Sequence, residues 1–357
     1  MRVLTLIPNQ YGYSPGQRGS IELWEPELKT AGISLDYAPF ETNEIREVLY
    51  HPGNNVKKAV EMMRAYLKRF NLLGKLDEYD AVFVYREAAL IGPAFFERLI
   101  ARRKPIIYQL DDPLYVPYKS PWNGYFSYFK FFGKIKEIIK MSRVVIANSS
   151  HIRDYALQFN RNVWQVPSVV DTNKFVFREP SENFEQEACI GWSGSATTTK
   201  NLAVVAEALQ QLSATIKPKI HLIGGTSFNL PNVNYTAQKW SAETEVDDLR
   251  QLQIGLIPVP VNEWNKRKFF MKSAQYMALG IVPVATPIGS NPEVINHGVN
   301  GFLANSTKEW VEYLTVLIKD SQMRLQMSQQ AVKDAQEKYS LSANMPKVIQ
   351  AFRFAAN

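Results

Sequence analysis

The chain has 357 residues, of which 46% are hydrophobic and 21% charged, a balance typical of a soluble globular protein with about two domains. This composition excludes a disordered chain, a collagen-like fibre and a coiled coil, and no apolar stretch approaches the about 20 residues that a membrane-spanning helix needs. The net charge of +7 comes mostly from residues 1–180, where 25 basic residues face 19 acidic ones, so we expect an anionic partner.

The N-terminal half alternates short apolar segments with helical ones. The predicted strands are Arg2–Pro8, Ile33–Phe40, Ala81–Tyr85, Pro105–Leu110 and Arg143–Ala147, and the first predicted helix is Ile21–Thr30. Such alternation predicts a mainly parallel sheet with helices on both faces.

A polar, acidic segment at 176–187 then interrupts the alternation and predicts a linker. The pattern restarts after it. It predicts strands at Ala188–Trp192, Lys219–Ile223, Ile254–Val259 and Val282–Thr286, helices at Lys200–Ser213 and from about Lys268 to Leu279, and a capping box at Ser306 and Glu309.

The resulting domain prediction has four parts. They are an N-terminal domain at 1–175, the linker at 176–187, a C-terminal domain at 188–340, and a C-terminal helix at 341–357 that packs back on the N-terminal domain. Both domains are predicted to be doubly wound α/β units, with the ligand in the cleft between them.

A basic stripe marks the helix predicted near Lys268. Lys268, Lys272 and Gln275 follow at helical spacing, beside backbone N–H groups that the first turn leaves without intrahelical partners. Two lysines at a helix N-terminus suit a diphosphate. The alternative is a solvated basic helix face.

Spaced motifs follow that stripe. They are Gln-Tyr-Met-Ala-Leu-Gly at 275–280, Pro-Val-Ala-Thr at 283–286, Ser-Asn-Pro-Glu at 290–293 and Gly-Val-Asn-Gly at 298–301. In this order they resemble the donor-binding half of the family 4 glycosyltransferases, which have the GT-B fold. The resemblance implies two Rossmann-like domains facing a central cleft, a nucleotide-sugar substrate, retention of anomeric configuration, and neither a required metal nor a cofactor.

Two positions depart from the family pattern. Where many members carry a glutamate pair that contacts the donor sugar and ribose, this chain has Arg267 and Gln275. Gln275 can still hydrogen-bond a ribose hydroxyl, whereas Arg267 accepts no hydrogen bond, so sugar recognition is expected to fall to Glu263 or to backbone groups. Lys200 matches the family's phosphate-binding lysine, while the partner arginine is replaced by Trp192 or Ser193.

The resemblance also assigns the remaining donor-side residues. The Gly194-Ser195 turn is expected to donate backbone N–H groups to phosphate. The alternative is that it only connects a strand to a helix. Lys239 and Trp240 fall where the nucleotide base would lie, although a lone tryptophan is as often part of a core. Gly16 and Arg18 lie in the first loop, which faces the donor phosphates and the acceptor in the family and would otherwise be a flexible turn.

An aspartate pair, Asp111 and Asp112, ends a predicted strand at the edge where α/β proteins bind ligands. Three interpretations compete: a divalent metal site, an acceptor pocket and a structural loop cap. We expect the acceptor pocket, with Asp111 in the reaction, Asp112 and Arg86 lining the site, and no metal.

Nine aromatic residues lie between Tyr115 and Phe132, interleaved with lysines. This composition predicts peripheral membrane contact through 115–140, and the alternative is a buried helix with a basic outer face. No nucleic-acid-binding motif accompanies it. With Cys189 as the single cysteine, a disulfide is excluded, and we expect a cytoplasmic protein without a signal peptide that touches the inner face of the membrane.

The sequence therefore predicts a bacterial hexosyltransferase of polysaccharide biosynthesis. It would move a sugar from a nucleotide-sugar donor, such as UDP-glucose, to a glycan or a lipid-linked acceptor, with Lys272 and Lys200 stabilising the departing diphosphate. Two alternatives stay open: an epimerase of UDP-sugars with the same fold, and a non-catalytic protein that binds nucleotide-sugars.

Overall fold

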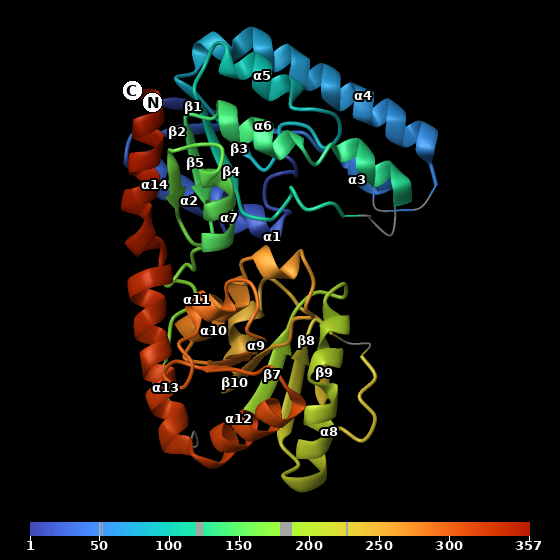
Figure 1. The fold of residues 1–357 in the computed structure, drawn as a ribbon, viewed down its shortest axis with the longest axis vertical. Helices are drawn as coiled ribbons and strands as arrows, with labels where there is room; N and C mark the ends of the chain where they lie inside the picture. Colours follow the sequence, from blue (N-terminus) through green and yellow to red (C-terminus); the bar gives the residue numbers. More distant parts are fainter. Residues whose placement is uncertain (50, 52, 119–123, 179–187, 226–227) are drawn as a thin grey trace. The chain divides into compact units, whose positions relative to one another are not determined.

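The computed structural model describes residues 1–49, 51, 53–118, 124–178, 188–225 and 228–357 (Figure 1). It divides into two compact units: unit 1 is Met1–Ser168 with Asn344–Asn357, and unit 2 is Val169–Ala343. Residues 179–187, which make up most of the predicted linker, lie outside the described residues. Within the described ranges, no helix has both the length and the hydropathy needed to cross a bilayer.

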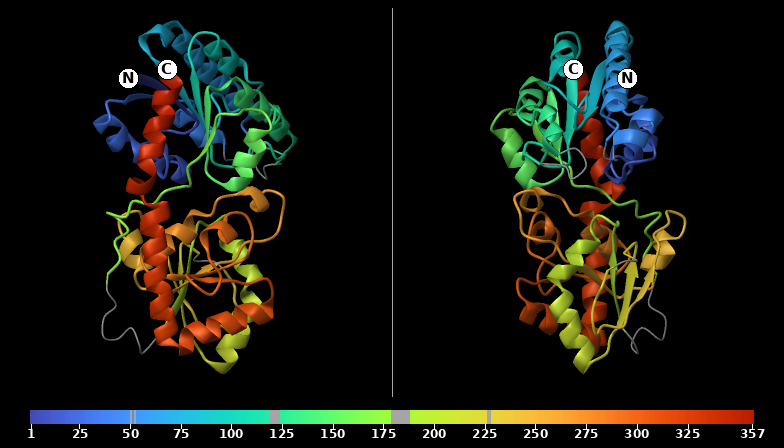
Figure 2. Two further views of the ribbon diagram at one scale, coloured as in Figure 1. Left: turned by 60° about the vertical axis from the view of Figure 1, so that its left-hand side comes forward. Right: turned by 90° about the vertical axis from the view of Figure 1, so that its right-hand side faces the viewer.

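Unit 1 is built on a six-stranded parallel sheet with the order β2-β1-β3-β4-β5-β6. The strands are β1 (Arg2–Ile7), β2 (Ser34–Pro39), β3 (Ala81–Tyr85), β4 (Ile106–Leu110), β5 (Val144–Ala147) and β6 (Val163–Gln165). Every residue of β3, β4 and β5 is buried. Helices lie on both faces of this sheet (Figure 2), and strands buried on both faces are typically continuous apolar runs.

Helices cover both faces of this sheet. They are α1 (Pro15–Arg18), α2 (Ile21–Thr30), α3 (Asn43–Leu49), α4 (Asn55–Leu72), η1 (Leu73–Glu78), α5 (Phe95–Ala101), η2 (Gly124–Lys130), α6 (Lys134–Met141), α7 (Ser150–Leu157) and α14 (Leu341–Ala356). Val82 and Val84 of β3 pack in one core with residues of α4, α5 and α6. Phe83 points the opposite way and stacks on Phe352 of α14 at 5.4 Å between ring centroids.

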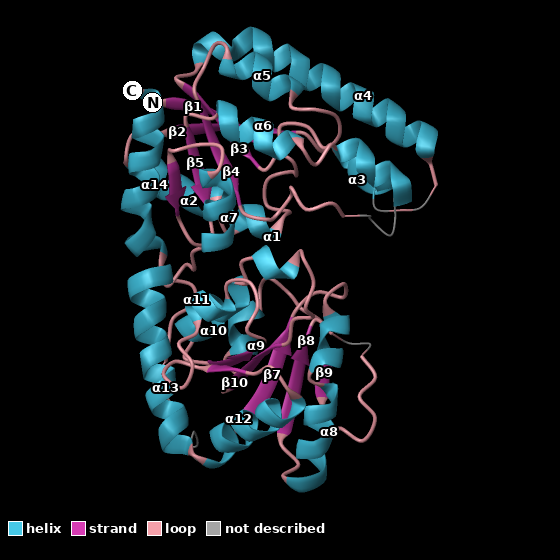
Figure 3. Cartoon of the chain, viewed as in Figure 1, coloured by secondary structure: helices cyan, strands magenta, loops and turns pink. Residues whose placement is uncertain are grey.

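Unit 2 contains a second six-stranded parallel sheet, with the order β12-β11-β10-β7-β8-β9. Its strands are β7 (Cys189–Ser193), β8 (Lys219–Ile223), β9 (Thr236–Gln238), β10 (Ile254–Ile257), β11 (Val282–Ala285) and β12 (Phe302–Leu303). One core cluster joins the sheet to α8 and α12, and another joins it to α10 and η6, so this sheet is also covered on both faces (Figure 3).

The helices of unit 2 differ from the predicted ones at two places. The observed helices are η4 (Thr199–Val204), α8 (Ala206–Thr215), α9 (Glu245–Leu249), η5 (Asn265–Arg267), α10 (Met271–Ala278), α11 (Asn291–Val294), α12 (Thr307–Lys319), α13 (Ser321–Asp334) and the π-helical turn η6 (Ala335–Tyr339). The predicted helix at 200–213 is divided into η4 and α8. The helix predicted from Lys268 begins instead at Met271, so Lys268 lies in extended backbone before it.

The cap predicted for α12 is present, because the Ser306 side chain accepts a hydrogen bond from the backbone N–H of Glu309. The prediction of two doubly wound α/β domains is confirmed as well. In each sheet the strand order reverses direction once, between β1 and β3 in unit 1 and between β7 and β10 in unit 2. Ligands of such sheets bind at the carboxyl ends of the strands beside this reversal, so we expect the functional site there.

Candidate active site

The carboxyl end of β7 in unit 2 is tied to α10 by side-chain contacts. The backbone N–H of Ser193 donates to the hydroxyl of Tyr276 at 2.9 Å, and the Nζ of Lys272 donates to the Oγ of Ser193 at 3.2 Å. Tyr276 is fully buried, and this burial raises the pKa of its hydroxyl. It fits there because β10 carries Gly255, whose missing Cβ would lie 2.3 Å from the Tyr276 ring. The Lys272 ammonium is therefore held at the end of β7, beside the point where the strand order of unit 2 reverses.

A carboxylate stands beside that ammonium. Glu245 Oε1 lies 3.9 Å from the Nζ of Lys272 and accepts from the indole Nε1 of Trp240 at 3.3 Å, while Glu245 Oε2 lies 3.4 Å from the Nζ of Lys174. Burial lowers the pKa of Lys272, and the charge of Glu245 opposes that shift. Glu245 and Lys174 had no signal in the sequence, because only the fold brings them next to Trp240 and Lys272.

The turns after β7 and β8 approach each other backbone to backbone. A Cβ on Gly224 would lie 2.0 Å from the carbonyl oxygen of Gly194, and Gly224 has a φ of +86°, which favours glycine. In the same region, the backbone N–H of Ser195 donates to Thr198 Oγ1 at 3.0 Å. Lys200 follows on η4 with an exposed side chain. The backbone N–H of Gly194 donates to the Ile223 carbonyl at 3.0 Å, so both N–H groups of the predicted Gly194-Ser195 turn have partners within unit 2.

The segment before α10 is held from outside the helix. The backbone N–H of Phe270 donates to the Oγ of Ser290 at 2.8 Å, and the backbone N–H of Ser290 donates to the carbonyl of Lys268 at 3.1 Å. Gly289, with a φ of +58°, packs against the Lys268 carbonyl, where a Cβ would be at 2.4 Å. These contacts keep Lys268 out of the helix, which is why the predicted helix start was wrong.

Glu263 is engaged on both carboxylate oxygens. Oε1 pairs with Lys266 and Oε2 with Arg267, each at 2.7 Å, and these hydrogen bonds lower the pKa of Glu263 to about 2. Gln275 is different: it is half-buried, and its side-chain amide makes no hydrogen bond to any described residue. Of the polar side chains predicted to contact the sugar or ribose, Gln275 is the one left available.

In unit 1, a buried cluster gathers at the reversal between β1 and β3. Arg86 donates from Nε to Asp111 Oδ1 at 2.6 Å, and from Nη2 to Asp111 Oδ2 at 2.8 Å and to Asp112 Oδ2 at 2.6 Å. Asp111 Oδ2 also accepts from the hydroxyl of Tyr85. Arg86 has a φ of +64°, so the turn after β3 holds a non-glycine residue in the left-handed region, where backbone strain marks functional sites.

Gly16 closes over this cluster. A Cβ on Gly16 would lie 2.8 Å from the Tyr85 hydroxyl, 3.0 Å from Arg86 Nη2 and 3.1 Å from Asp111 Oδ2. The structure therefore brings together four predicted site residues of unit 1: Gly16, Arg86, Asp111 and Asp112. Arg18 follows two residues later, at the end of the short α1. Because both oxygens of Asp111 are taken up by Arg86 and Tyr85, its contacts fit a role in positioning Arg86.

A second ion pair supports the turn that carries Arg86, and sequence reasoning missed it. Lys134 Nζ lies 2.8 Å from Glu87 Oε2 and donates to the Ala89 carbonyl at 2.8 Å, with both charged side chains less than one-tenth exposed. Glu97 accepts from the Ala88 N–H at 2.9 Å, and burial raises the pKa of Glu97. The sequence shows these residues only as ordinary charges in a loop and a basic helix.

The aromatic segment 115–140 divides into two parts. In α6, residues Ile135, Ile138 and Ile139 are buried in the core of unit 1, as the alternative prediction of a buried helix requires. Tyr128, Phe129 and Phe131 are about half exposed. Residues 119–123 lie outside the described residues, and they include Trp122, one of the nine aromatic residues of the predicted membrane-contact segment.

Within the described residues, no group of three or more His, Cys, Asp or Glu side chains is arranged to hold a metal ion. Asp111 and Asp112 face Arg86 instead.

Sequence comparison identifies the domain that contains the unit 2 site. Residues 187–320 match the family Glycosyl transferases group 1. This part of the chain is a group 1 glycosyl transferase domain. It includes Ser193, Gly194, Lys200, Lys272 and Gln275, so the lysine at the sheet reversal belongs to this domain.

Solved structures with the same fold cover nearly the whole chain. HepE from Anabaena, crystallised with UDP, superposes with a TM-score of 0.69 at 15% identity, over 99% of this chain and 100% of that one. Sucrose-phosphate synthase from Thermosynechococcus elongatus gives a TM-score of 0.70 at 13% identity, over 100% and 99%. The chain has the GT-B fold, as predicted.

One curated relative is the GDP-Man:Man(3)GlcNAc(2)-PP-Dol alpha-1,2-mannosyltransferase of Dictyostelium discoideum. It is 22% identical over an alignment of 255 residues, and the match covers 60% of this chain. The chain matches about half of that relative's length, 48%. The resemblance to glycosyltransferases of the GT-B fold is thus confirmed, and assignment to family 4 and retention stay predictions.

Proposed function

We propose that the protein is a hexosyltransferase that moves a sugar from a nucleotide-sugar donor to a saccharide or lipid-linked acceptor with retention of configuration. The observation that carries this proposal is the Lys272 ammonium at the end of β7, inside the group 1 glycosyl transferase domain. A UDP-sugar such as UDP-glucose is our proposed donor, because structures of Anabaena HepE contain UDP or UDP-glucose. The Dictyostelium relative is named for a dolichol-linked acceptor, which supports a lipid-linked acceptor.

The reaction needs positive charge where the diphosphate leaves. Lys272 would hold a phosphate oxygen as a point charge, and Lys200 and Lys268 would add charge from the neighbouring turns. The backbone N–H groups of Gly194 and Ser195 donate to the Ile223 carbonyl and to Thr198 Oγ1, so we assign the phosphate contacts to the lysines. Lys272 suits this role because Ser193 and Glu245 hold its ammonium in place before a ligand arrives.

The nucleotide base would lie against Trp240, which is 38% exposed and fixed by its hydrogen bond to Glu245. Lys239, the preceding residue, is also exposed. A held indole with an accessible face is suited to stacking on a base.

Unit 1 would supply the acceptor side. Arg86 presents a guanidinium whose orientation is fixed by Asp111 and Asp112, and Gly16 lets the loop after β1 pack close to it, where a Cβ would lie 3.0 Å from Arg86 Nη2. A rigid guanidinium of this kind can donate hydrogen bonds to acceptor hydroxyl or phosphate oxygens. Asp111 then acts by positioning Arg86, and Arg18 adds charge to the same loop.

Release of UDP tests the proposed function. The protein is incubated with UDP-sugars, with and without acceptor extracts, and free UDP is measured over time. A transferase releases UDP faster with acceptor. Conversion of the donor sugar without acceptor would indicate an epimerase, and thermal stabilisation by UDP-sugar without turnover would indicate a binding protein. A ligand at 100 times its dissociation constant adds about 2.7 kcal/mol of stability, which a thermal-shift screen of donors detects.

Activity should survive chelation by EDTA. Lysine ammonium groups would balance the charge of the diphosphate, so the leaving group needs no metal cation. Turnover is measured after EDTA treatment and again after adding Mg²⁺ or Mn²⁺. Complete loss with EDTA, restored by either ion, would contradict the proposal and return Asp111 and Asp112 to consideration as metal ligands.

Gln275→Ala should weaken UDP binding by about 0.5–1.5 kcal/mol, the worth of one neutral hydrogen bond to a ribose hydroxyl. Gln275→Glu should retain or strengthen binding, because a carboxylate accepts from both ribose hydroxyls and Lys272 lies one turn away. Calorimetric titration of UDP measures both variants, with Gln251→Ala on an exposed turn as control. Unchanged affinity in Gln275→Ala would remove Gln275 from the ribose site.

Membrane contact and a cytoplasmic location at the inner face remain proposals. The proposed contact within 115–140 now rests on the exposed Tyr128, Phe129 and Phe131, because the isoleucines of α6 are buried.

A further inference from the structure

Helix α4 carries an apolar stripe on its solvent side. Its five residues are Val56, Val60, Met63, Leu67 and Phe70, which are 80%, 45%, 63%, 59% and 55% exposed. Their spacing alternates between four and three residues, so they form one line along the helix. The opposite side of α4 packs into unit 1 through Met62, Ala65 and Arg69. A continuous exposed apolar line of this length marks an interaction surface.

Cations follow one edge of the stripe. Lys57, Arg64 and Lys68 are exposed and lie seven and four residues apart, which places them in a row beside it. The one acidic residue of α4, Glu61, is buried and pairs with Arg64 at 2.6 Å. Glu47 of α3 lies 3.8 Å from Lys57. The exposed Lys57–Glu47 pair contributes little stability, so an external phosphate can replace the Glu47 carboxylate. Arg64 is 64% exposed and has further N–H groups besides the one that pairs with Glu61.

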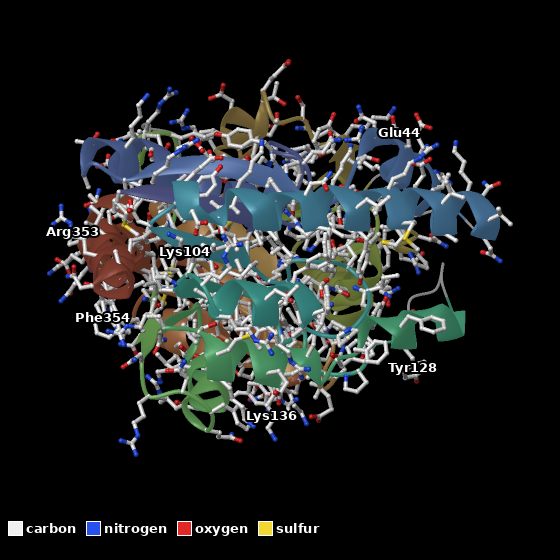
Figure 4. The ribbon with its side chains drawn as sticks, turned by 90° about the horizontal axis from the view of Figure 1, so that it is seen from above. Glu44, Lys104, Tyr128, Lys136, Arg353 and Phe354 are labelled. Carbon is white, nitrogen blue, oxygen red and sulfur yellow. The ribbon has the colours of Figure 1, made fainter. Side chains whose placement is uncertain are left out.

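An exposed aromatic residue lies on a segment that hydrogen bonds connect to α4. Tyr66 of α4 donates to the Ile91 carbonyl, and the next N–H, of Gly92, donates to the Phe129 carbonyl at 2.7 Å. The backbone of Phe129 is therefore connected to α4 through Ile91 and Gly92, and the Phe129 ring is 55% exposed. Figure 4 shows α4 crossing the view, with Glu44 of α3 on one side and Tyr128 on the other.

We propose that α4 docks unit 1 on an anionic membrane surface, with the stripe in the interfacial region and Lys57, Arg64 and Lys68 at the lipid phosphates. An interfacial helix needs these features: an apolar face, a cationic border and few exposed acidic residues. A second copy of the chain fits the charges less well, because antiparallel two-fold pairing of α4 sets the cationic row against itself. The proposal does not depend on the transferase activity.

Vesicle sedimentation tests this surface. The full chain is mixed with vesicles of phosphatidylcholine alone or of phosphatidylcholine with phosphatidylglycerol, and the bound fraction gives a partition coefficient. Met63→Gln/Leu67→Gln removes the centre of the stripe, and Lys57→Gln/Lys68→Gln removes two cations. The matched controls are Val261→Gln/Val299→Gln, which changes exposed apolar residues of unit 2, and Lys29→Gln/Lys319→Gln. The melting temperature and the circular-dichroism spectrum are measured for each variant to show that it is folded.

We expect the wild type to bind the anionic vesicles and to dissociate as salt rises. The stripe variant should lose about tenfold or more in partition coefficient. The lysine variant should lose about fivefold for each charge removed. The controls should bind as the wild type does.

Either of two kinds of result, a failure in vesicle binding or a stripe-dependent dimer, would overturn the proposal. One is equal binding by the folded stripe variant and the wild type, or no wild-type binding to anionic vesicles. The other is a wild-type dimer in sedimentation velocity that the stripe variant converts to monomer without any change in vesicle binding, which would make the stripe a contact between copies. Failure of UDP release with intact vesicle binding would instead contradict the proposed function alone.

Discussion

Lys272→Ala should reduce turnover by about 10²–10³ at saturating donor, the usual loss when one electrostatic donor to a developing charge is removed. The ammonium of Lys272 is held by Ser193 Oγ at 3.2 Å at the end of β7, so its position does not depend on the ligand. Charge on the diphosphate is greatest as the glycosidic bond breaks. Lys272 should therefore affect the turnover number more than UDP binding.

Steady-state release of UDP across donor concentrations separates these two effects. Lys266→Ala is the matched control, since Lys266 is an exposed lysine of the same group 1 domain that pairs with Glu263 at 2.7 Å, and it should keep wild-type turnover. The melting temperature should change little, because Lys272 is about one-third exposed. Near wild-type turnover in Lys272→Ala at saturating donor would remove this residue from the mechanism.

The nine predicted strands were recognisable because apolar runs of four to six residues leave few alternatives once a parallel sheet is covered on both faces. The short strands β6, β9 and β12, of two or three residues, were not predicted. Ala81–Tyr85 and Ile21–Thr30 match β3 and α2 residue for residue. The start of α10 was not predictable. Lys268 follows a helical pattern in sequence, but Ser290 and Gly289, about twenty residues away, hold it in extended backbone.

The site showed the same division between local pattern and tertiary contact. Lys272 and Gln275 could be chosen from a motif, because both lie on one face of a single helix. Glu245, which faces Lys272, lies on a different helix, and no sequence spacing predicts that the two residues are close. The α4 stripe was missed because both sides of that helix carry apolar residues: Met62 is buried and Met63 is exposed, a difference that only the packed unit reveals.

Lys134→Met should destabilise unit 1 by about 3–5 kcal/mol, because it leaves the Glu87 carboxylate buried without its cation. The side chains of Lys134 and Glu87 are 3% and 8% exposed, and their Nζ–Oε2 distance is 2.8 Å. For a domain of this size the melting temperature should fall by about 10 °C or more. Thermal unfolding followed by circular dichroism measures the change. Lys140→Met on the same helix is the control, since Lys140 is half exposed and pairs with Glu137 at 3.7 Å.

The double variant Lys134→Met/Glu87→Met distinguishes an unpaired charge from lost packing. Replacing both partners by apolar side chains of similar volume removes the buried charge, so this variant should recover most of the lost stability, apart from the Ala89 carbonyl that loses its donor. The single variant should also approach the wild type as the pH falls through the range where carboxyl groups titrate, because an uncharged carboxylic acid is far less unfavourable to bury than a carboxylate. Equal instability of the single and double variants at all pH values would show that Lys134 acts through its volume alone. The turn from Arg86 to Ala89 would then be held by packing, and the acceptor side proposed for unit 1 would lose its electrostatic support.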